Sequence, residues 1–303
     1  MSLAWRQRVG DLDDFAASAK MRLGSTRPMV TSLAAQDHDA IRHAARHGLP
    51  IALLLVGLAA LGAVLFELAV HQCLSIELRR RHNDVAAAIF SVVGVTFAVL
   101  LAFVAMLAWE GFNKAKAAAY AEAATVLDVF NASVGLGGPE TSQMRDAIIG
   151  YLETVVRVEW PAQAEGVVVD RGKTYLEKLN TLAIGLKPSS VAEGNLHAQL
   201  LQSLARLQDA RQQRLLAAET TIPAVIWIVT IVGGALTIAF GSFLGVPSLG
   251  MHLAMSAALA ISGALVLILI IALSNPFRGD FRVSTLPFDR VLTQIQASKI
   301  TDR

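Results

Sequence analysis

The sequence predicts an all-α, polytopic membrane protein with four transmembrane helices and a helical cytoplasmic domain between the second and the third. Composition is the first observation behind this fold class, because 54% of the 303 residues are hydrophobic and only 17% are charged. Soluble domains carry about a quarter of charged residues. The second observation is the mean hydropathy of +0.52, which also indicates a membrane protein. The third observation is that four apolar runs are long enough to cross a bilayer and are separated into two pairs by a polar stretch.

The second apolar run organises the predicted bundle. From Val85 to Trp109 it has 25 residues without a charge. At about 1.5 Å per residue this length crosses a hydrocarbon core about 30 Å thick. We therefore predict a transmembrane helix over 85–109. The helical pattern continues toward Phe130, so we expect this helix to project out of the membrane and to end at the glycines that begin with Gly135.

Small residues recur along one side of this second helix. Such a stripe lets another helix approach closely and gain contacts that lipid tails do not offer. Its members are Ala87, Ser91, Gly94, Ala98, Ala102 and Ala105. We predict that they pack against neighbouring helices of the same or another subunit. Helix packing alone accounts for the stripe, and a pore-lining role is the alternative.

The other apolar runs complete the predicted membrane part. They give a first span over about 50–70, a third over about 222–244 and a fourth over about 251–273. We expect Pro223 in the first turn of the third span, where its missing N–H costs little. The resulting segments are an N-terminal extension 1–48, a first helix pair 49–109, a polar domain 110–221, a second helix pair 222–273 and a tail 274–303.

Residues 110–221 are predicted to form a helical bundle. Ser190 and Glu193 stand three apart as a capping box, which starts a long helix. Leucines and Arg211 follow along one side of it, as expected for core positions. The alternative is that the basic residues before the third span contact anionic lipid headgroups; they are Arg206, Arg211 and Arg214.

Basic residues predict the orientation. With four spans, the N-terminus, the 110–221 domain and the C-terminus share one side, which holds 23 of the 26 Lys and Arg residues. Without the long domain the count is still 12 against 3. Basic residues concentrate in the cytoplasm. We therefore predict an inner-membrane protein with both termini in the cytoplasm.

The three basic residues on the outer side run against this rule. In a ring of subunits Arg79, Arg80 and Arg81 would form a positive vestibule that raises the local anion concentration. The alternative is contact with headgroups and pairing with nearby acids, which are Glu67, Glu77 and Asp84. Histidines on this face also make a pH effect conceivable; they are His71, His82 and His252.

Four stretches together carry a family resemblance. They are VVGVTFAVLLAF in the second span, YLETVVRVEWP in the polar domain, the arginine-rich helix that leads to a third span with Pro223 and Trp227, and PFRG after the fourth span. The chain resembles the bacterial bestrophin-like family over about residues 50–290. More remotely it is similar to the bestrophins, which are pentameric anion channels with a pore-lining second helix.

The resemblance implies candidate site residues. Phe90, Val93 and Phe97 stand where bestrophins place a hydrophobic neck, so they are the predicted pore-lining residues. Asn275 to Phe277 looks like the start of the bestrophin calcium-binding tail. Only Asp280 follows as a carboxylate, and a hard cation needs several oxygens, so we predict no metal site and no cofactor.

The predicted function is that of a channel-like homo-oligomer in the lipid bilayer, with a pentamer as one candidate assembly, that passes anions such as chloride. The alternative is a membrane-anchored sensor or scaffold that acts through 110–221. No nucleic-acid partner is expected. The sequence has no Gly-rich phosphate loop, no HExxH and no Gly-x-Ser-x-Gly, so we do not expect an enzyme.

Overall fold

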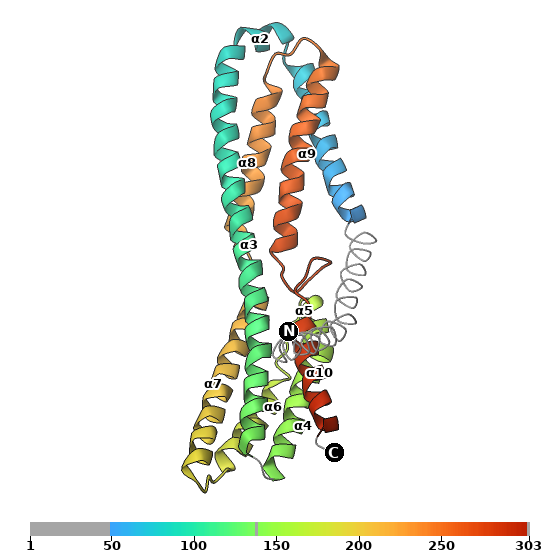
Figure 1. The fold of residues 1–303 in the computed structure, drawn as a ribbon. Helices are drawn as coiled ribbons and strands as arrows, with labels where there is room; N and C mark the ends of the chain where they lie inside the picture. The colour runs from blue at the N-terminus through green and yellow to red at the C-terminus, as the bar shows by residue number, and fades with distance from the viewer. Residues whose placement is uncertain (1–48, 137–138, 302–303) are drawn as a thin grey trace, which may run out of the picture. The chain divides into compact units, whose positions relative to one another are not determined.

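The computed structural model describes residues 49–136 and 139–301, and the compact unit Ala52–Arg303 holds nearly all of them. All regular elements in these ranges are helices (Figure 1). They are a first helix Leu49–Cys73, α2 Ile76–Arg81, α3 Asn83–Leu136, α4 Pro139–Thr154, a π-helical turn Val155–Glu159, α5 Trp160–Ala164, α6 Lys173–Gly185, α7 Val191–Glu219, α8 Ala224–Ser242, α9 Leu249–Leu273 and α10 Leu286–Thr301. The predicted all-α fold class with four membrane-length helices is confirmed. The predicted extension 1–48 lies outside the described residues.

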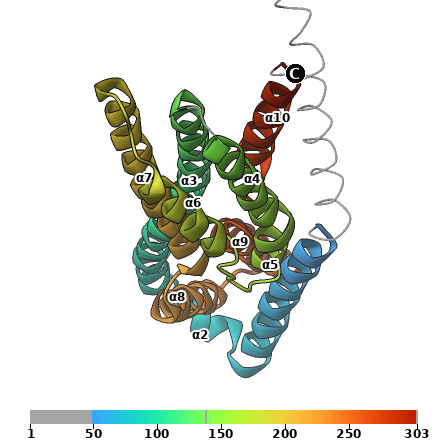
Figure 2. The ribbon, with the colours of Figure 1, turned by 90° about the horizontal axis from the view of Figure 1, so that it is seen from below.

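Helix α3 is the longest element and joins the membrane part to the polar bundle. Its 54 residues span about 80 Å, far more than a hydrocarbon core of about 30 Å. Along one part it packs against α8 and α9, and along the other against α7, α4 and α10 (Figure 1). In the bundle, α6 lies between α4 and α7 (Figure 2). The predicted helical continuation of the second span beyond Trp109 is confirmed, and its projection out of the membrane remains a prediction.

The starts of α7 and α8 can be compared with those predicted from the sequence. The Ser190 hydroxyl accepts a hydrogen bond from the Glu193 N–H at 3.2 Å, so the predicted cap of α7 is confirmed. The Glu193 carboxylate accepts from Ser189, at its N–H and at its hydroxyl. For α8 the predicted start was about two residues early, because Pro223 is the N-cap residue with an extended ψ of 141° and α8 begins at Ala224.

Gly245, in the link between α8 and α9, lies against the backbone of α2. Its N–H donates to the Asn83 side-chain oxygen at 2.9 Å. The Asn83 side chain, at the start of α3, therefore holds this link. A Cβ on Gly245 would lie 2.7 Å from the Arg80 amide nitrogen, closer than real side chains approach.

Replacement of Gly245 by alanine should therefore destabilise the membrane part, because backbone rather than a flexible side chain must move. We expect a loss of about 1–3 kcal/mol, as for other overpacked sites. Thermal unfolding of the detergent-solubilised protein measures this. The matched control is Gly250→Ala, since nothing lies within 4 Å of its Cβ position. Equal melting temperatures for the two variants would contradict the close approach.

Candidate functional site

The predicted pore-lining residues lie on the face of α3 that packs inside the chain. The Phe97 ring is against two glycines of α8, with a carbon 2.9 Å from the Cβ position of Gly233 and another 3.1 Å from that of Gly234. The Phe90 ring is 3.4 Å from the Cβ position of Gly241. Val93 lies between them and is also half-buried. Within the single chain this face therefore packs against α8, and its lining of a pore remains a prediction.

The small-residue stripe lies at the edge of this packed face. Gly94 and Ala105 are half-buried within the chain. The other four members are exposed, and they are Ala87, Ser91, Ala98 and Ala102. Most of the stripe is thus free to meet a helix of another subunit, and its packing role there remains a prediction.

The remaining face of α3 exposes large apolar side chains. Phe103 and Met106 are each 69% exposed, and Val92 is 67% exposed. Together with Val85, Ile89 and Val99 they follow each other at spacings of three, four or seven residues, so they lie on one side of the helix. This row runs along the full membrane-length part of α3. The sequence-based predictions had not singled out this row.

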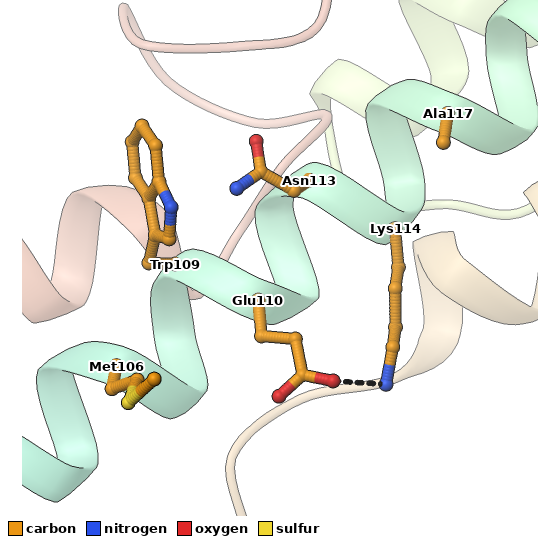
Figure 3. Close-up of a pocket in the computed structure, with 6 residues that line it drawn as sticks. All are labelled: Met106, Trp109, Glu110, Asn113, Lys114 and Ala117. Atoms are coloured by element: carbon orange, nitrogen blue, oxygen red, sulfur yellow. Dashed lines mark ion pairs between the residues drawn. The ribbon is translucent and has the colours of Figure 1, made fainter.

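Polar residues continue this face where α3 reaches the bundle. A shallow hollow is lined by Met106, Trp109, Glu110, Asn113, Lys114 and Ala117 (Figure 3). All six come from α3, so the hollow is an open surface on one helix. Lys114 Nζ lies 2.7 Å from Glu110 Oε1, and both side chains are exposed. The exposed face therefore changes from apolar to charged within about two turns.

A buried polar cluster, which we call the α2 junction, joins the membrane helices at the ends that lie next to α2. It consists of Glu67, His71, Arg79 and His252 with the carbonyl groups of Gly241 and Ser242. Arg79 Nη1 donates to Glu67 Oε1 and to the Ser242 carbonyl, both at 3.1 Å. Arg79 is 4% exposed and Glu67 is 0% exposed. Glu67 thus faces protein rather than the headgroup level.

This geometry removes Arg79 from the predicted anion vestibule. Its guanidinium forms a buried ion pair with Glu67. This is the alternative stated above, in which these arginines pair with nearby acids. Arg80 and Arg81 are exposed at the same end of the helices. The vestibule remains a prediction for these two residues alone.

A second buried cluster, the bundle network, lies where α3 crosses α7. Arg214 Nε donates to Glu122 Oε2 at 2.5 Å, and its Nη2 donates to Glu159 Oε2 at 2.8 Å. Arg211 Nη2 donates to Glu159 Oε1 at 2.5 Å. The Tyr151 hydroxyl donates to Glu122 Oε1 at 2.5 Å and accepts from Arg211 Nη1 at 3.1 Å. Two positive and two negative charges therefore balance each other in the core.

The bundle network decides the role of the α7 arginines. Arg214 is 0% exposed and Arg211 is 4% exposed, so the alternative of lipid contact is wrong for both. The core position predicted for Arg211 is confirmed, whereas Arg206 is exposed. Arg211 also donates to Asp170 Oδ1, at 3.1 Å from Nε and 2.6 Å from Nη2, which fixes the segment between α5 and α6.

A π-helical turn brings Glu159 into this network. Pro161 has no N–H, so the α-helical hydrogen bond to the carbonyl four residues earlier is missing. The Trp160 N–H, one residue earlier, bonds to the Val155 carbonyl five residues back rather than to that of Val156. Glu159 is fully buried at the end of this turn and also accepts from the Gly172 N–H at 2.7 Å. Turns of this kind are frequent at functional sites.

Trp160 attaches the chain that follows α9 to the bundle network. Its indole N–H donates to the Val283 carbonyl at 3.1 Å. Its ring makes edge contacts with Phe277 and Phe288, with centroids 5.3 and 5.4 Å away. Arg214 lies over the same ring. Helices α3 and α7 and the chain that follows α9 thus converge on one buried centre.

Burial and charge act on two acids of the network. Burial raises the pKa of the Tyr151 hydroxyl well above its usual range, and the nearby Glu122 carboxylate raises it further. For Glu159, burial by itself raises the pKa, but the hydrogen bond and charge of Arg211 and the charge of Arg214 outweigh it and lower the pKa. Tyr151 therefore stays neutral and Glu159 stays ionised.

The lowered pKa of Glu159 predicts acid sensitivity of the bundle. Its stabilisation is present above the pKa of an unfolded glutamate, about 4.3, and is lost as pH falls through the lower folded pKa. We expect the melting temperature to drop as pH is lowered below about 4. The Glu159→Gln variant should show a shallower drop. An equally steep drop in the variant would assign the acid sensitivity to other carboxylates.

Sequence reasoning had not singled out Glu122. It lies in an alanine-rich stretch, AKAAAYAEAA, that reads as an ordinary solvated helix. The available signal was the three-residue spacing of Arg211 and Arg214, which places both on one side of α7 beside its core leucines. Two buried arginines require buried acids, but sequence alone does not tell which ones.

Metal ligands do not gather in the described part of the chain. Among residues 49–136 and 139–301, no group of three or more His, Cys, Asp or Glu side chains could hold a metal ion. Asn275 lies two residues after the end of α9, and Asp280 lies in the turn that follows.

The Bestrophin-like domain family matches residues 56–288 of this sequence. The chain belongs to the bestrophin-like family. The match includes α2 to α9 and begins within the first helix, so the bestrophin-like part contains both the α2 junction and the bundle network. The predicted resemblance is confirmed.

Solved structures of bacterial bestrophin homologs share this fold. One single-substitution variant from Klebsiella pneumoniae is 12% identical with a TM-score of 0.61, over 80% of this chain and 99% of that one. A second variant from the same organism is 15% identical with a TM-score of 0.52, over 82% and 96% of the two chains. No curated protein matches the sequence. The bestrophin-like chain is thus a membrane protein with the bestrophin fold.

Proposed function

We propose that this bestrophin-like protein assembles as a homo-oligomeric channel in the cell membrane and passes anions such as chloride. One observation carries the proposal. The membrane part of α3 keeps a mostly apolar face exposed in a single chain, with Thr96 as a polar member between Val92 and Val99, although α3 packs against several other helices. Family membership supports a channel-like protein.

The exposed row is preferred here to the face of Phe90, Val93 and Phe97, because α8 packs against that face within the chain. We propose that Val92, Val99, Phe103 and Met106 face the axis of the oligomer and form its hydrophobic constriction. The small-residue stripe beside them then meets the neighbouring subunit, where small side chains allow close helix contact. Hydrophobic constrictions gate by dewetting, so their width controls the passage of hydrated ions.

Charge supports the proposed orientation. With α2 outside, the 110–221 domain and both termini lie in the cytoplasm, in line with the distribution of Lys and Arg. Arg80 and Arg81 then surround the outer entrance in each subunit, where they attract anions. Chloride efflux from liposomes that contain the purified protein tests the proposal, with native mass giving the subunit number. A monomer or dimer without chloride efflux would contradict it.

A sensor or scaffold is the second candidate. It is favoured by α3, which runs without a break from the membrane into the bundle network. A soluble partner that binds the whole protein, and whose binding is lost on substitution of exposed bundle residues such as Arg206, would support it. Under this candidate the liposomes would show no chloride efflux.

A further inference from the structure

His252 lies between two hydrogen-bond acceptors in the α2 junction. Its Nδ1 is 2.9 Å from Glu67 Oε1, and its Nε2 is 3.2 Å from the Gly241 carbonyl oxygen. A carbonyl accepts only, and so does an ionised carboxylate. A neutral imidazole carries a hydrogen on one nitrogen and can make only one of the two bonds. The observed pair of contacts therefore needs one further proton.

The number of protons that the Glu67–His252 pair must hold does not depend on which of the two residues carries the additional one. It resides either on His252, as imidazolium beside an ionised Glu67, or on Glu67 Oε1, which then donates to His252 Nδ1. Arg79 Nη1 also donates to Glu67 Oε1, which favours the ionised carboxylate. In both cases the Glu67–His252 pair holds one proton more than an ionised glutamate beside a neutral histidine.

His71, which contacts Arg79, has the opposite requirement and must be neutral. Its Nδ1 is 2.7 Å from Arg79 Nη2. Arginine only donates hydrogen bonds and stays charged, so His71 Nδ1 must accept and carry no hydrogen. Protonation of His71 would place two positive groups in direct contact. The contact therefore exists only while His71 is neutral.

We propose that the α2 junction is a proton-binding site that is complete only within a window of pH. The Glu67–His252 pair must hold its proton, and His71 must lack one. Loss of the first proton at high pH breaks one of the two contacts by which His252 of α9 holds the first helix and α8. Gain of the second at low pH breaks the contact of His71 with Arg79, one of the two that join the first helix to α2.

The groups that face this site come from every element around it. The first helix supplies Glu67 and His71, α2 supplies Arg79, and α9 supplies His252. Helix α8 supplies the carbonyl groups of Gly241 and Ser242, which do not titrate. His82, at the end of α2, bonds to the Leu78 carbonyl and is exposed. Two histidines and one carboxylate therefore govern the response, which is independent of the proposed channel function.

Thermal unfolding of the full-length protein in detergent, from pH 5 to pH 9, tests the proposal. Histidine changes charge in this range. The wild-type melting temperature should be highest near neutral pH and fall on both sides, by about 3 °C or more. His252→Gln should remove the fall at high pH only. His71→Asn, whose side-chain oxygen replaces the Nδ1 acceptor, should remove the fall at low pH only.

Two further variants keep the test decisive. Glu67→Gln should also remove the fall at high pH, so it replaces His252→Gln if that variant does not fold. His197→Gln is the matched control, because His197 lies in α7 and contacts the Ala183 carbonyl far from the junction. It should keep both falls. A wild-type profile that is flat from pH 5 to 9, or both falls retained in the His252 and His71 variants, would overturn the proposal.

Discussion

Replacement of Arg214 by methionine will destabilise the protein by about 3–5 kcal/mol, the usual cost of leaving a buried charge without its partner. Arg214 is the fully buried link between Glu122 of α3 and Glu159 of the π-helical turn. Its loss leaves Glu122 without an arginine hydrogen bond in a dry core. Denaturant or thermal unfolding of the detergent-solubilised protein measures the effect.

Two comparisons separate charge from packing in this experiment. Arg206→Met changes an exposed arginine of the same helix and should alter stability by less than about 0.5 kcal/mol. The double variant Glu122→Gln with Arg214→Met removes both charges and should be more stable than Arg214→Met alone. If the single and double variants were equally unstable, the loss would come from packing on Trp160 rather than from the unpaired carboxylate.

Replacement of Phe103 by alanine will raise chloride efflux from liposomes severalfold. Phe103 is the largest side chain of the exposed row on α3. If this row forms the constriction, a smaller side chain widens it and makes it easier to wet. The oligomer should remain intact, because the ring has few contacts within its own chain.

Phe97→Ala is the matched control for this prediction. The two phenylalanines lie six residues apart on the same helix, but the Phe97 ring fills the surface of Gly233 and Gly234. Its removal should lower the melting temperature and leave the efflux rate per oligomer unchanged. Higher efflux from Phe97→Ala than from Phe103→Ala would return the constriction to the face predicted from sequence.

The membrane helices could be predicted because their signal is local. Each needs only a run of about 20 apolar residues, and a capping serine marks α7. The facing direction of α3 could not be predicted in this way. A helix that is apolar all round gives no hydrophobic stripe, so Phe97 and Phe103 look equivalent in the sequence. The difference between them depends on Gly233 and Gly234 of α8, because two glycines leave room for an aromatic ring from a neighbouring helix.

The buried clusters escaped prediction for a different reason. Their partners are far apart in the chain, as with Glu122 and Arg214, which are 92 residues apart. A charge in the sequence is read as exposed unless its partner is known. Arg79 is an example. In the sequence it is one of three adjacent arginines, and only the fold shows that Arg79 is buried whereas Arg80 and Arg81 are exposed.

Disulfide cross-linking tests the central claim most directly, namely that the exposed row of α3 faces the axis of an oligomer. Cys73 is the single cysteine of the chain, so Cys73→Ser gives a background without thiols. In that background, Phe103→Cys should form covalent dimers of the chain under mild oxidation in membranes, because symmetry copies meet at the axis. Phe97→Cys, shielded by α8, should not. Cross-linking of the Phe97 variant, with none for the Phe103 variant in an intact oligomer, would contradict the account.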